Sequence, residues 1–319
     1  MSGMRLEYLW DETTNEIVRD AVGPAAPAFE LLTHLGDGAV LLVAGILIYW
    51  FGARGNRRKR AFVIAVGTAA LALSAGMKGI MEIPRPELAF SPDGYPGFTF
   101  PSAHAMGAAA FYGALAVSME RGTKGIRYLM AGAIITVVAV SRVVMGVHYA
   151  GDVVVGVGLG LALVGVGLWV REEELFDPGP LFLIATAIAV VAALLGSRVF
   201  VTLTLGASIG GTIGWYYVRN RRTTTVGASI LVLGLVGIGG IIALRGLSAL
   251  IGYGVSGGTN TTGVLVLEVI AYATLTATVM AVPHFGLRIE QRPSVRWLQE
   301  TLPFRGRIIG PEKSFTRDD

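Results

Sequence analysis

Apolar stretches of nearly membrane-spanning length follow one another along most of this 319-residue chain. Their approximate extents are Leu31–Phe51, Ala61–Ile83, His104–Met119, Tyr128–Met145, His148–Val170, Leu181–Leu195, Val199–Val218, Val226–Leu250 and Val264–Val282. Each is close to or a little below the roughly 20 residues that a helix needs to cross a bilayer. Charged residues make up only 15% of the chain, against roughly 25% in a soluble domain. The sequence therefore predicts an all-α, polytopic membrane helical bundle with about nine transmembrane helices.

Basic residues gather in short clusters between these stretches. The clusters at 53–60, 121–127 and 219–222 follow the first, third and seventh stretches. Because positively charged loops stay in the cytoplasm, all three clusters agree with an N-terminus outside and a C-terminus inside the cell. This pattern predicts an integral multi-pass protein of the cell membrane and no binding of nucleic acid. The chain has no cysteine, which excludes disulfides and thiol chemistry.

The predicted orientation places two cations at one helix end on the outer face. Lys78 and Arg85 lie seven residues apart at the end of the second stretch, and Pro84 disfavours a helix through Ile83. Taken alone, a lysine at a membrane helix end is usually an anchor.

Two further polar segments are expected on the same face. In the first, Ser102 is a good N-cap for a helix that starts near Ala103, where free backbone N–H groups attract phosphate. In the second, Arg142 ends the fourth stretch, and His148 and Asp152 lie four residues apart on one helix face. The coincidence of these groups with His104 on one membrane face points to a site rather than to separate structural roles.

Phosphoryl transfer is the chemistry that such a set suits, because its catalysis is mostly positioning and charge stabilisation. The cations Lys78, Arg85 and Arg142 can surround the phosphate oxygens. One histidine can attack phosphorus when neutral, and the other can protonate the leaving oxygen. Asp152 is expected to fix the tautomer of His148. The cations take over the electrostatic role of a metal, so the sequence predicts neither a metal nor a cofactor.

The order Lys-x6-Arg-Pro, Pro-Ser-x-His and Ser-Arg-x5-His-x3-Asp resembles the type 2 phosphatidic acid phosphatase (PAP2) superfamily, membrane-bound branch. The matching positions are Lys78, Arg85, Pro86, Pro101, Ser102, His104, Ser141, Arg142, His148 and Asp152. The resemblance implies that His148 is the nucleophile, Asp152 its partner and His104 the general acid. It also implies that phosphate is bound by Lys78, Arg85, Ser102, Arg142 and the Ala103 amide. Ala103 stands where the family usually has glycine.

The resemblance covers only part of the chain. We expect an N-terminal extracytoplasmic or interfacial segment over 1–30, a PAP2-like catalytic transmembrane core over 31–197, further transmembrane helices over 198–283 and a cytoplasmic tail over 284–319. Gly206, Gly210 and Gly214 form a small-residue face that is expected to pack against another helix of the same chain.

Four functions are compatible with these residues. The leading hypothesis is a phosphatase of a lipid phosphate or a polyprenyl diphosphate, because a site at headgroup depth suits a membrane substrate. The alternative is a phosphatase of a small soluble ester, since glucose-6-phosphatases share the motif and resemble this chain in span number and orientation. Vanadate-dependent haloperoxidases share the pocket but are soluble. A transporter or scaffold with an inactive site is disfavoured, because no motif residue is lost. Oligomeric state stays open.

Two charges interrupt the last apolar stretches. Arg245 lies before the expected outer end of the eighth stretch and Glu268 after the outer start of the ninth. A charge at membrane depth costs a few kcal/mol unless it is paired or hydrated. The sequence predicts an ion pair between them, with snorkelling of Arg245 and protonation or hydration of Glu268 as the alternative.

Overall fold

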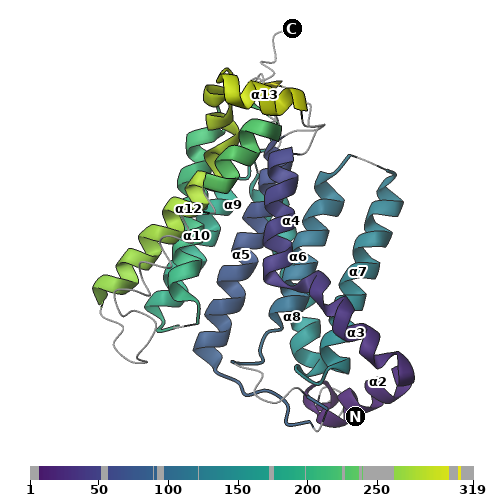
Figure 1. The fold of residues 1–319 in the computed structure, drawn as a ribbon. Helices are drawn as coiled ribbons and strands as arrows, with labels where there is room; N and C mark the ends of the chain where they lie inside the picture. The colour runs from purple at the N-terminus through teal and green to yellow at the C-terminus, as the bar shows by residue number, and fades with distance from the viewer. Residues whose placement is uncertain are drawn as a thin grey trace.

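The computed structural model describes residues 7–51, 57–88, 90–91, 97–120, 122–171, 176–197, 199–224, 227–236, 239, 262–301 and 308–309. Figure 1 shows a bundle of helices whose N-terminal segment lies across one end. The α-helices are α2 (Glu12–Val22), α3 (Ala26–Leu32), α4 (Gly38–Phe51), α5 (Arg57–Met81), α6 (Ala103–Ser118), α7 (Lys124–Val144), α8 (Ala150–Val170), α9 (Gly179–Leu194), α10 (Val201–Val218), α12 (Thr262–Ile289) and α13 (Pro293–Thr301). Short 3₁₀ turns are η1 (Tyr8–Trp10), η2 (Gly23–Ala25) and η3 (Thr33–Gly36). The described strands are the antiparallel pair β1 (Thr223–Thr224) and β2 (Ile308–Ile309).

The fold is all-helical in its framework, as predicted, with several helices apolar enough to cross a membrane. Four described segments meet that length and composition on their own: Arg57–Met81, Lys124–Val144, Ala150–Val170 and Leu265–Ile289. A bent pair, Glu12–Gly36 with Gly38–Phe51, adds a possible fifth. Shorter apolar helices occupy Ala103–Ser118, Gly179–Leu194 and Gly227–Val236. The number nine stays a prediction, and most of the eighth stretch lies outside the described residues.

The first apolar stretch is not the single straight helix that its composition predicts. The chain bends by 47° between η3 and α4. Asp37 has extended backbone angles at this point, and its carboxylate accepts a hydrogen bond from the Ala39 backbone N–H at 2.9 Å. An aspartate that caps the start of a helix in this way ends the preceding turn. The bend directs the chain from α3 across the end of the bundle.

Close packing of α6 against α8 positions the candidate site. A Cβ atom added at Gly160 would lie 2.5 Å from the Met106 carbonyl oxygen, and one at Gly156 would lie 2.8 Å from the Ser102 carbonyl oxygen. The two helices thus approach backbone to backbone, which only glycine permits at these positions. The starts of α6 and α8 are therefore held side by side, and both carry motif residues.

The small-residue face of α10 packs as predicted against a helix of the same chain. Added Cβ atoms at Gly206, Gly210 and Gly214 would all lie within 3 Å of α12 atoms. The partner of Gly210 is the Ala273 carbonyl oxygen, 2.2 Å from the added atom. The face therefore joins α10 to α12.

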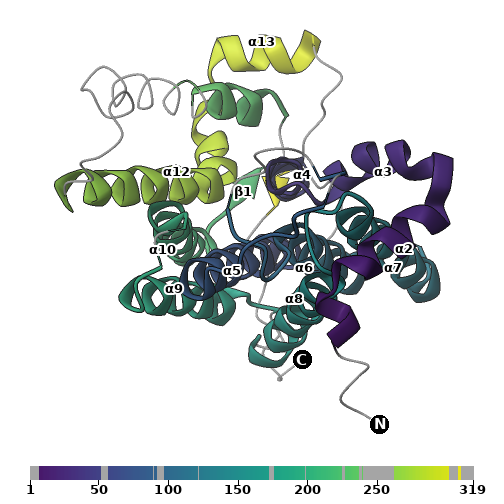
Figure 2. The same cartoon turned by 90° about the horizontal axis from the view of Figure 1, so that it is seen from below.

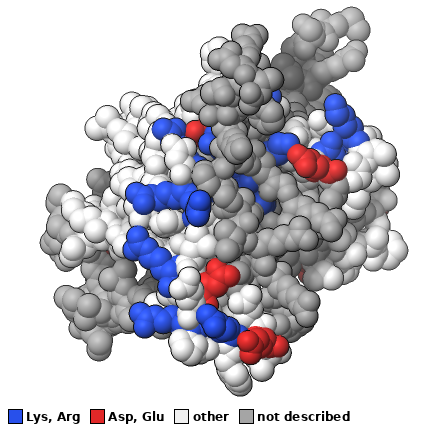
Figure 3. Space-filling view, turned by 90° about the horizontal axis from the view of Figure 1, so that it is seen from above, with Lys and Arg blue, Asp and Glu red and all other residues white. Residues whose placement is uncertain are grey.

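The two ends of the bundle differ in charge. Figure 3 views the end that carries α13, where Lys and Arg side chains gather. This end receives the starts of α5 and α7 and the end of α10, which contribute Lys59, Lys124, Arg219 and Arg221, among others. The opposite end holds the N-terminal segment and the motif residues (Figure 1).

Candidate functional site

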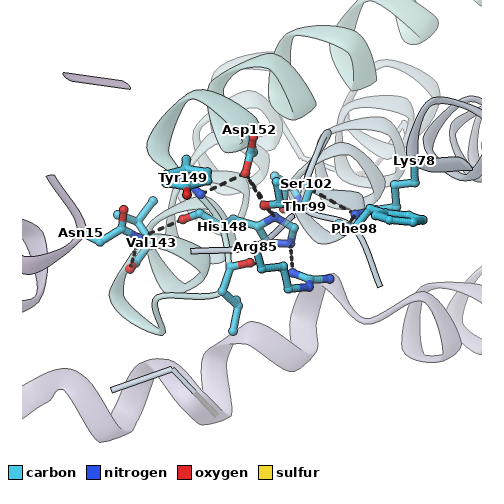
Figure 4. Close-up of polar contacts among 12 residues, drawn as sticks. Asn15, Lys78, Arg85, Phe98, Thr99, Ser102, Val143, His148, Tyr149 and Asp152 are labelled. Atoms are coloured by element: carbon cyan, nitrogen blue, oxygen red, sulfur yellow. Dashed lines mark hydrogen bonds and ion pairs between the residues drawn. The ribbon is translucent and has the colours of Figure 1, made fainter. Parts of the chain in front are cut away.

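The motif residues come from five segments that meet at one end of the bundle, and Figure 4 shows Lys78, Arg85, Ser102, His148 and Asp152 among them. The end of α5 and the loop after it contribute Lys78 and Arg85, the start of α6 contributes Ser102, Ala103 and His104, the end of α7 contributes Arg142, the α7–α8 turn contributes His148, and the first turn of α8 contributes Asp152. The structure brings all the predicted site residues to this end.

His148 lies in the turn between α7 and α8 and is 2% exposed. Its Nε2 atom is 3.2 Å from Nη1 of Arg85, which also donates to the Val147 carbonyl oxygen at 2.6 Å. Its Nδ1 atom is 3.0 Å from the Thr99 hydroxyl oxygen. Both ring nitrogens therefore have a polar neighbour.

The neighbours of the ring select one tautomer. A guanidinium group only donates hydrogen bonds, so Nε2, which faces Arg85, is the accepting nitrogen. The proton then sits on Nδ1 and is donated to Thr99, whose own hydroxyl donates to Oδ2 of Asp152. An imidazole in this form has its lone pair on Nε2, the atom that faces the cations.

Burial and charge both favour the neutral form of this imidazole. Burial is the largest cause that holds the pKa of His148 well below its usual range, and the positive charges of Arg85, Arg142 and Lys78 lower this pKa further. A cationic imidazole would lose hydration and meet three like charges. His148 is therefore uncharged at neutral pH, which is the state that a base or a nucleophile requires.

Asp152 reaches His148 through a third residue. Its Oδ2 atom is 3.6 Å from Nδ1 of His148, whereas the Thr99 hydroxyl lies between them and bonds both. Oδ2 also accepts a hydrogen bond from the Tyr149 backbone N–H at 2.9 Å. A carboxylate in the first turn of α8 is further stabilised by the helix dipole. Asp152 is thus a fixed, fully buried acceptor at the end of a short chain of hydrogen bonds.

Thr99 is the site residue that sequence reasoning missed. It is fully buried, and its carbonyl oxygen accepts a hydrogen bond from Nζ of Lys78 at 3.1 Å. It therefore touches groups from three motif segments. Its only signal in the sequence is a hydroxyl in the aromatic run Phe98–Phe100, just before the Pro-Ser pair, and no period or spacing marks it.

Lys78 holds the loop before α6. Its ammonium group donates to the carbonyl oxygens of Phe98 and Thr99. An ammonium group has three donors, so one is left for a ligand after the two bonds that Lys78 makes to described residues. The buried lysine thus stabilises the loop that carries Thr99. This structural role is one that the motif alone does not indicate.

A cavity of about 370 Å³ opens beside Arg142 and His104. The lining residues are Arg19, Glu30, Thr33, His34, Asp37, Phe90, His104, Arg142 and Met145. Arg142 is 1% exposed, and its Nη1 atom donates to the Thr33 hydroxyl at 2.8 Å. The cavity gives a polar ligand access to the two motif residues from the N-terminal side.

The start of α6 has the geometry predicted for an anion site. Ser102 is the N-cap, the helix begins at Ala103, and the Ser102 hydroxyl faces the Ala105 N–H at 3.5 Å. The Ser102 backbone N–H donates a hydrogen bond to the Asp152 carbonyl oxygen at 3.1 Å. The Ala103 side chain is exposed, so its methyl group does not crowd the packed core. The first amides of α6 therefore present the positive end of the helix to the site.

Comparison with known proteins places this geometry in a family. The PAP2 superfamily pattern matches residues 59–176, which include every predicted site residue. Phosphatidylglycerophosphatase B of Bacillus subtilis (strain 168) is 34% identical over 141 residues, or 41% of this chain and 68% of that protein. Lipid A 1-phosphatase of Porphyromonas gingivalis is 28% identical over 140 residues, or 44% of this chain and 31% of that protein, so the match spans about a third of its length. A crystal structure of a transmembrane PAP2-type phosphatidylglycerolphosphate phosphatase from Bacillus subtilis is 30% identical, covers 50% of this chain and 87% of its own, and aligns with a TM-score of 0.42.

Proposed function

Because the chain belongs to the PAP2 superfamily and is a membrane phosphatase, we propose that it hydrolyses a lipid phosphate or a polyprenyl diphosphate through a phosphohistidine. The observation that carries this proposal is the state of His148. Its Nε2 lone pair faces Arg85, while Nδ1–H is linked through Thr99 to Asp152. This is the form of imidazole that a phosphorus nucleophile needs.

In the first step, Nε2 of His148 forms a bond to phosphorus as the bond from phosphorus to the leaving oxygen breaks. The leaving oxygen takes a proton from His104, which we propose is protonated when the negative charge of the bound phosphate offsets the neighbouring cations. His148 gains a positive charge in this step, and its Nδ1–H keeps the bond to Thr99. The Asp152 carboxylate at the end of that chain stabilises the charge.

In the second step, water attacks phosphorus and the bond to Nε2 breaks, which returns the electron pair to His148. The now neutral His104 takes the proton of the water. Inorganic phosphate leaves, and both histidines regain their starting states. The reaction needs no cofactor, and we propose that it needs no metal.

The phosphate oxygens are proposed to contact Lys78, Arg85, Arg142, Ser102 and the Ala103 amide. Arg85 lies 3.2 Å from Nε2 of His148, and the positive charges of Lys78 and Arg142 also lower the pKa of this imidazole, which supports placing all three cations around the phosphate. Phosphate entering beside Nε2 would replace the present contact between Arg85 and the imidazole. Charge stabilisation by such fixed donors is the main catalytic effect in phosphoryl transfer.

The choice of a lipid substrate rests on where the site lies. It sits at one end of apolar helices that qualify as membrane spans. If these helices cross the bilayer, that end lies near the lipid headgroups. Both enzymes to which the chain is similar have lipids in their names. A phosphate on a membrane lipid would reach this end without leaving the bilayer.

A small soluble phosphate ester is the second candidate, and one observation favours it. The cavity beside His104 and Arg142 is lined mostly by polar side chains, among them Glu30, His34 and Asp37. Such a lining suits a hydroxylated group next to the phosphate better than a hydrocarbon chain.

We propose that the site faces the outside of the cell. The basic end shown in Figure 3 lies opposite the site, and positive charge favours the cytoplasmic side. This orientation has an external N-terminus and a cytoplasmic C-terminus, and we propose about nine spans between them. It divides the chain into an external or interfacial segment over 1–30, a catalytic core over 31–197, added helices over 198–283 and a cytoplasmic tail over 284–319.

Phosphate release from purified protein in liposomes tests the proposal. Phosphatidic acid, a polyprenyl diphosphate and glucose 6-phosphate are compared side by side, with and without a chelator. We expect turnover of a lipid substrate that the chelator does not reduce. Turnover of the sugar phosphate alone would replace the lipid assignment by the second candidate, and a strict need for a divalent ion would contradict the metal-free mechanism.

A further inference from the structure

The segment from Trp10 to Gly36 precedes the family-matched region, yet it contacts several parts of the site. Figure 2 shows the N-terminal segment crossing the end of the bundle, with α2 and α3 against α7 and the η1 turn against α8. The Trp10 ring packs against Gly151 of α8, where an added Cβ atom would lie 2.4 Å from the indole. The Glu12 carboxylate accepts a hydrogen bond from the Glu87 backbone N–H at 2.8 Å, in the loop that carries Arg85.

Asn15 makes the closest connection to the nucleophile. This residue of α2 is fully buried, and its Nδ2 group donates to the carbonyl oxygens of His148 at 2.8 Å and Val143 at 3.0 Å (Figure 4). Val143 lies in the last turn of α7 and His148 lies just before α8. One amide therefore ties together the two ends of the turn that presents the imidazole.

The bonds made by Asn15 satisfy a local need of the backbone. The last carbonyl groups of a helix have no partner within it, and those at the end of α7 are buried. Arg19, one turn later in α2, donates to the Val144 carbonyl oxygen at 2.8 Å. Gly146 in the same turn has φ of +67°, so the turn has a fixed and unusual course. Helix α2, which lies outside the catalytic helices, thus supplies hydrogen-bond donors to the carbonyl groups on both sides of this turn.

The same segment also supports the phosphate cage. The Thr33 hydroxyl of η3 accepts the hydrogen bond from Arg142 at 2.8 Å, and Thr33 is 4% exposed. An added Cβ atom at Gly36 would lie 3.1 Å from the His104 carbonyl oxygen. The segment thus packs against the start of α6 as well as against the α7–α8 turn.

We propose that this N-terminal segment is a working part of the active site, in which Asn15 positions His148 and Thr33 positions Arg142. The inference rests on the proposed function, because it assigns to these residues the support of the nucleophile and of one phosphate ligand. It predicts two separable defects, one in the chemical step and one in phosphate binding.

Asn15→Leu and Asn15→Asp test the first arm in the full-length protein. Both keep a side chain of similar size and remove the two amide donors. Misplacing a reacting group by about 1 Å can cost about a hundredfold in rate, so we expect kcat to fall by about ten- to a hundredfold. The inhibition constant of inorganic phosphate should stay as in the wild type, because Asn15 does not contact the cage.

Thr33→Val tests the second arm with the opposite signature. It removes the hydroxyl that holds Arg142 and keeps the shape of the side chain. A hydrogen bond to a charged group is worth about 1.5 kcal/mol or more, so the phosphate inhibition constant and KM should rise by about tenfold. The loss in kcat should be smaller than for Asn15→Leu.

Thr14→Val is the matched control, because among the described residues the Thr14 hydroxyl bonds only to the Tyr8 carbonyl oxygen, at 2.6 Å, and not to a site residue. It should keep kcat, KM and phosphate inhibition. A purely structural role would lower the folded fraction and the unfolding midpoint of the Asn15 variants but leave kcat per folded molecule unchanged, and that result would overturn the inference. Since Asn15→Leu and Asn15→Asp disturb folding differently, either one that folds decides the question. Activity that survives His148→Ala would instead overturn the proposed function itself.

Discussion

The N-terminal segment and the C-terminal helices both lie outside the family-matched region, but they contact the core in different ways. The N-terminal segment donates side-chain hydrogen bonds to the His148 turn and accepts one from Arg142. The C-terminal α10 and α12 pack against each other through glycine and backbone atoms. The first addition therefore extends the site, whereas the second extends the bundle.

The polar contacts of the C-terminal helices lie away from the site residues. Asp177, which follows α8, accepts hydrogen bonds from the Trp215 indole at 2.6 Å and from Arg219 at 3.0 Å. The Tyr49 hydroxyl of α4 donates to the Met280 carbonyl oxygen at 2.8 Å. These bonds attach α10 and α12 to the core near the basic end of the bundle. An addition at that end can influence stability without reaching the chemistry.

The largest expected effect belongs to the core that both additions flank. His148→Ala removes the proposed nucleophile, so kcat should fall by about 10⁴-fold or more, as it does when other enzymes lose theirs. The measurement is phosphate release in liposomes, combined with acid-quench trapping of a phosphorylated protein from labelled substrate. Trapping in the wild type and its loss in the variant are expected. Wild-type turnover by this variant would show that His148 is not the nucleophile, and the N-terminal segment would then not support the catalytic site.

Thr99 gives the next largest effect. Thr99→Val keeps the shape of the side chain and breaks the link between His148 and Asp152, and a hydrogen bond to a charged group is worth about 1.5–3 kcal/mol, or about ten- to a hundredfold in kcat. Thr99→Ser keeps the hydroxyl and should restore most of the activity. Equal losses in the two variants would mean that packing, rather than the hydroxyl, fixes the orientation of the His148 ring. The comparison of the two additions would then rest on Asn15 alone.

The protonation state and tautomer of His148 can be tested by spectroscopy. Because its pKa is lowered by burial and then by the neighbouring cations, the neutral ring with Nδ1–H should persist as the pH falls through the ordinary imidazole value of 6.5. Below that value His148 binds a proton in the unfolded chain but not in the folded one. The free energy of unfolding therefore decreases as the pH falls from 6.5 towards the folded-state pKa of His148. Nitrogen-15 spectra of labelled histidine, assigned by His148→Ala, report both tautomer and protonation. A ring that is already cationic near pH 6.5 would contradict the assignment.

The motif residues were predictable because their chemistry is tied to short spacings within the chain. His148 and Asp152 are separated by one helical turn, and Ser102 precedes a helix as an N-cap should. Their meeting at one end followed from alternating spans and from the positions of the basic clusters. The small-residue face of Gly206, Gly210 and Gly214 was likewise readable, since close helix contacts demand small residues.

Other parts of the site could not be read from the sequence, because they depend on contacts between distant segments. Asn15 lies 133 residues from His148, and nothing in its own helix marks it as a partner of that turn. Thr99 bridges His148 and Asp152, whose spacing of four residues suggested a direct contact. The bend at Asp37 also breaks an apolar stretch whose composition favours one helix. Tertiary packing decides all three features.

Gly210→Leu tests the claim that the C-terminal helices are structural. A side chain here would collide with the Ala273 backbone, and overpacking of this kind costs about 1–3 kcal/mol. We expect a lower unfolding midpoint in detergent with unchanged kcat per folded molecule. Gly158→Leu is the matched control, since an added Cβ atom at Gly158 meets nothing within 4 Å among the described residues. A fall in kcat without loss of stability would place α10 and α12 within the catalytic unit and end the contrast.

The smallest expected effect concerns the charge within α12. Glu268 accepts a hydrogen bond from the Thr202 hydroxyl of α10 at 2.8 Å, and the predicted partner Arg245 lies outside the described residues. Thr202→Val removes only the hydrogen bond, which in membranes is worth about 0.6 kcal/mol on average. Glu268→Gln keeps an acceptor for Thr202 but removes the charge, so it should cost more than Thr202→Val if the Arg245 ion pair exists. The measurement is the unfolding midpoint of each variant, and kcat should be unchanged in both. A lower midpoint for Glu268→Gln than for Thr202→Val would show that the charge contributes more than the hydrogen bond. A Glu268→Gln variant as stable as the wild type would exclude the ion pair.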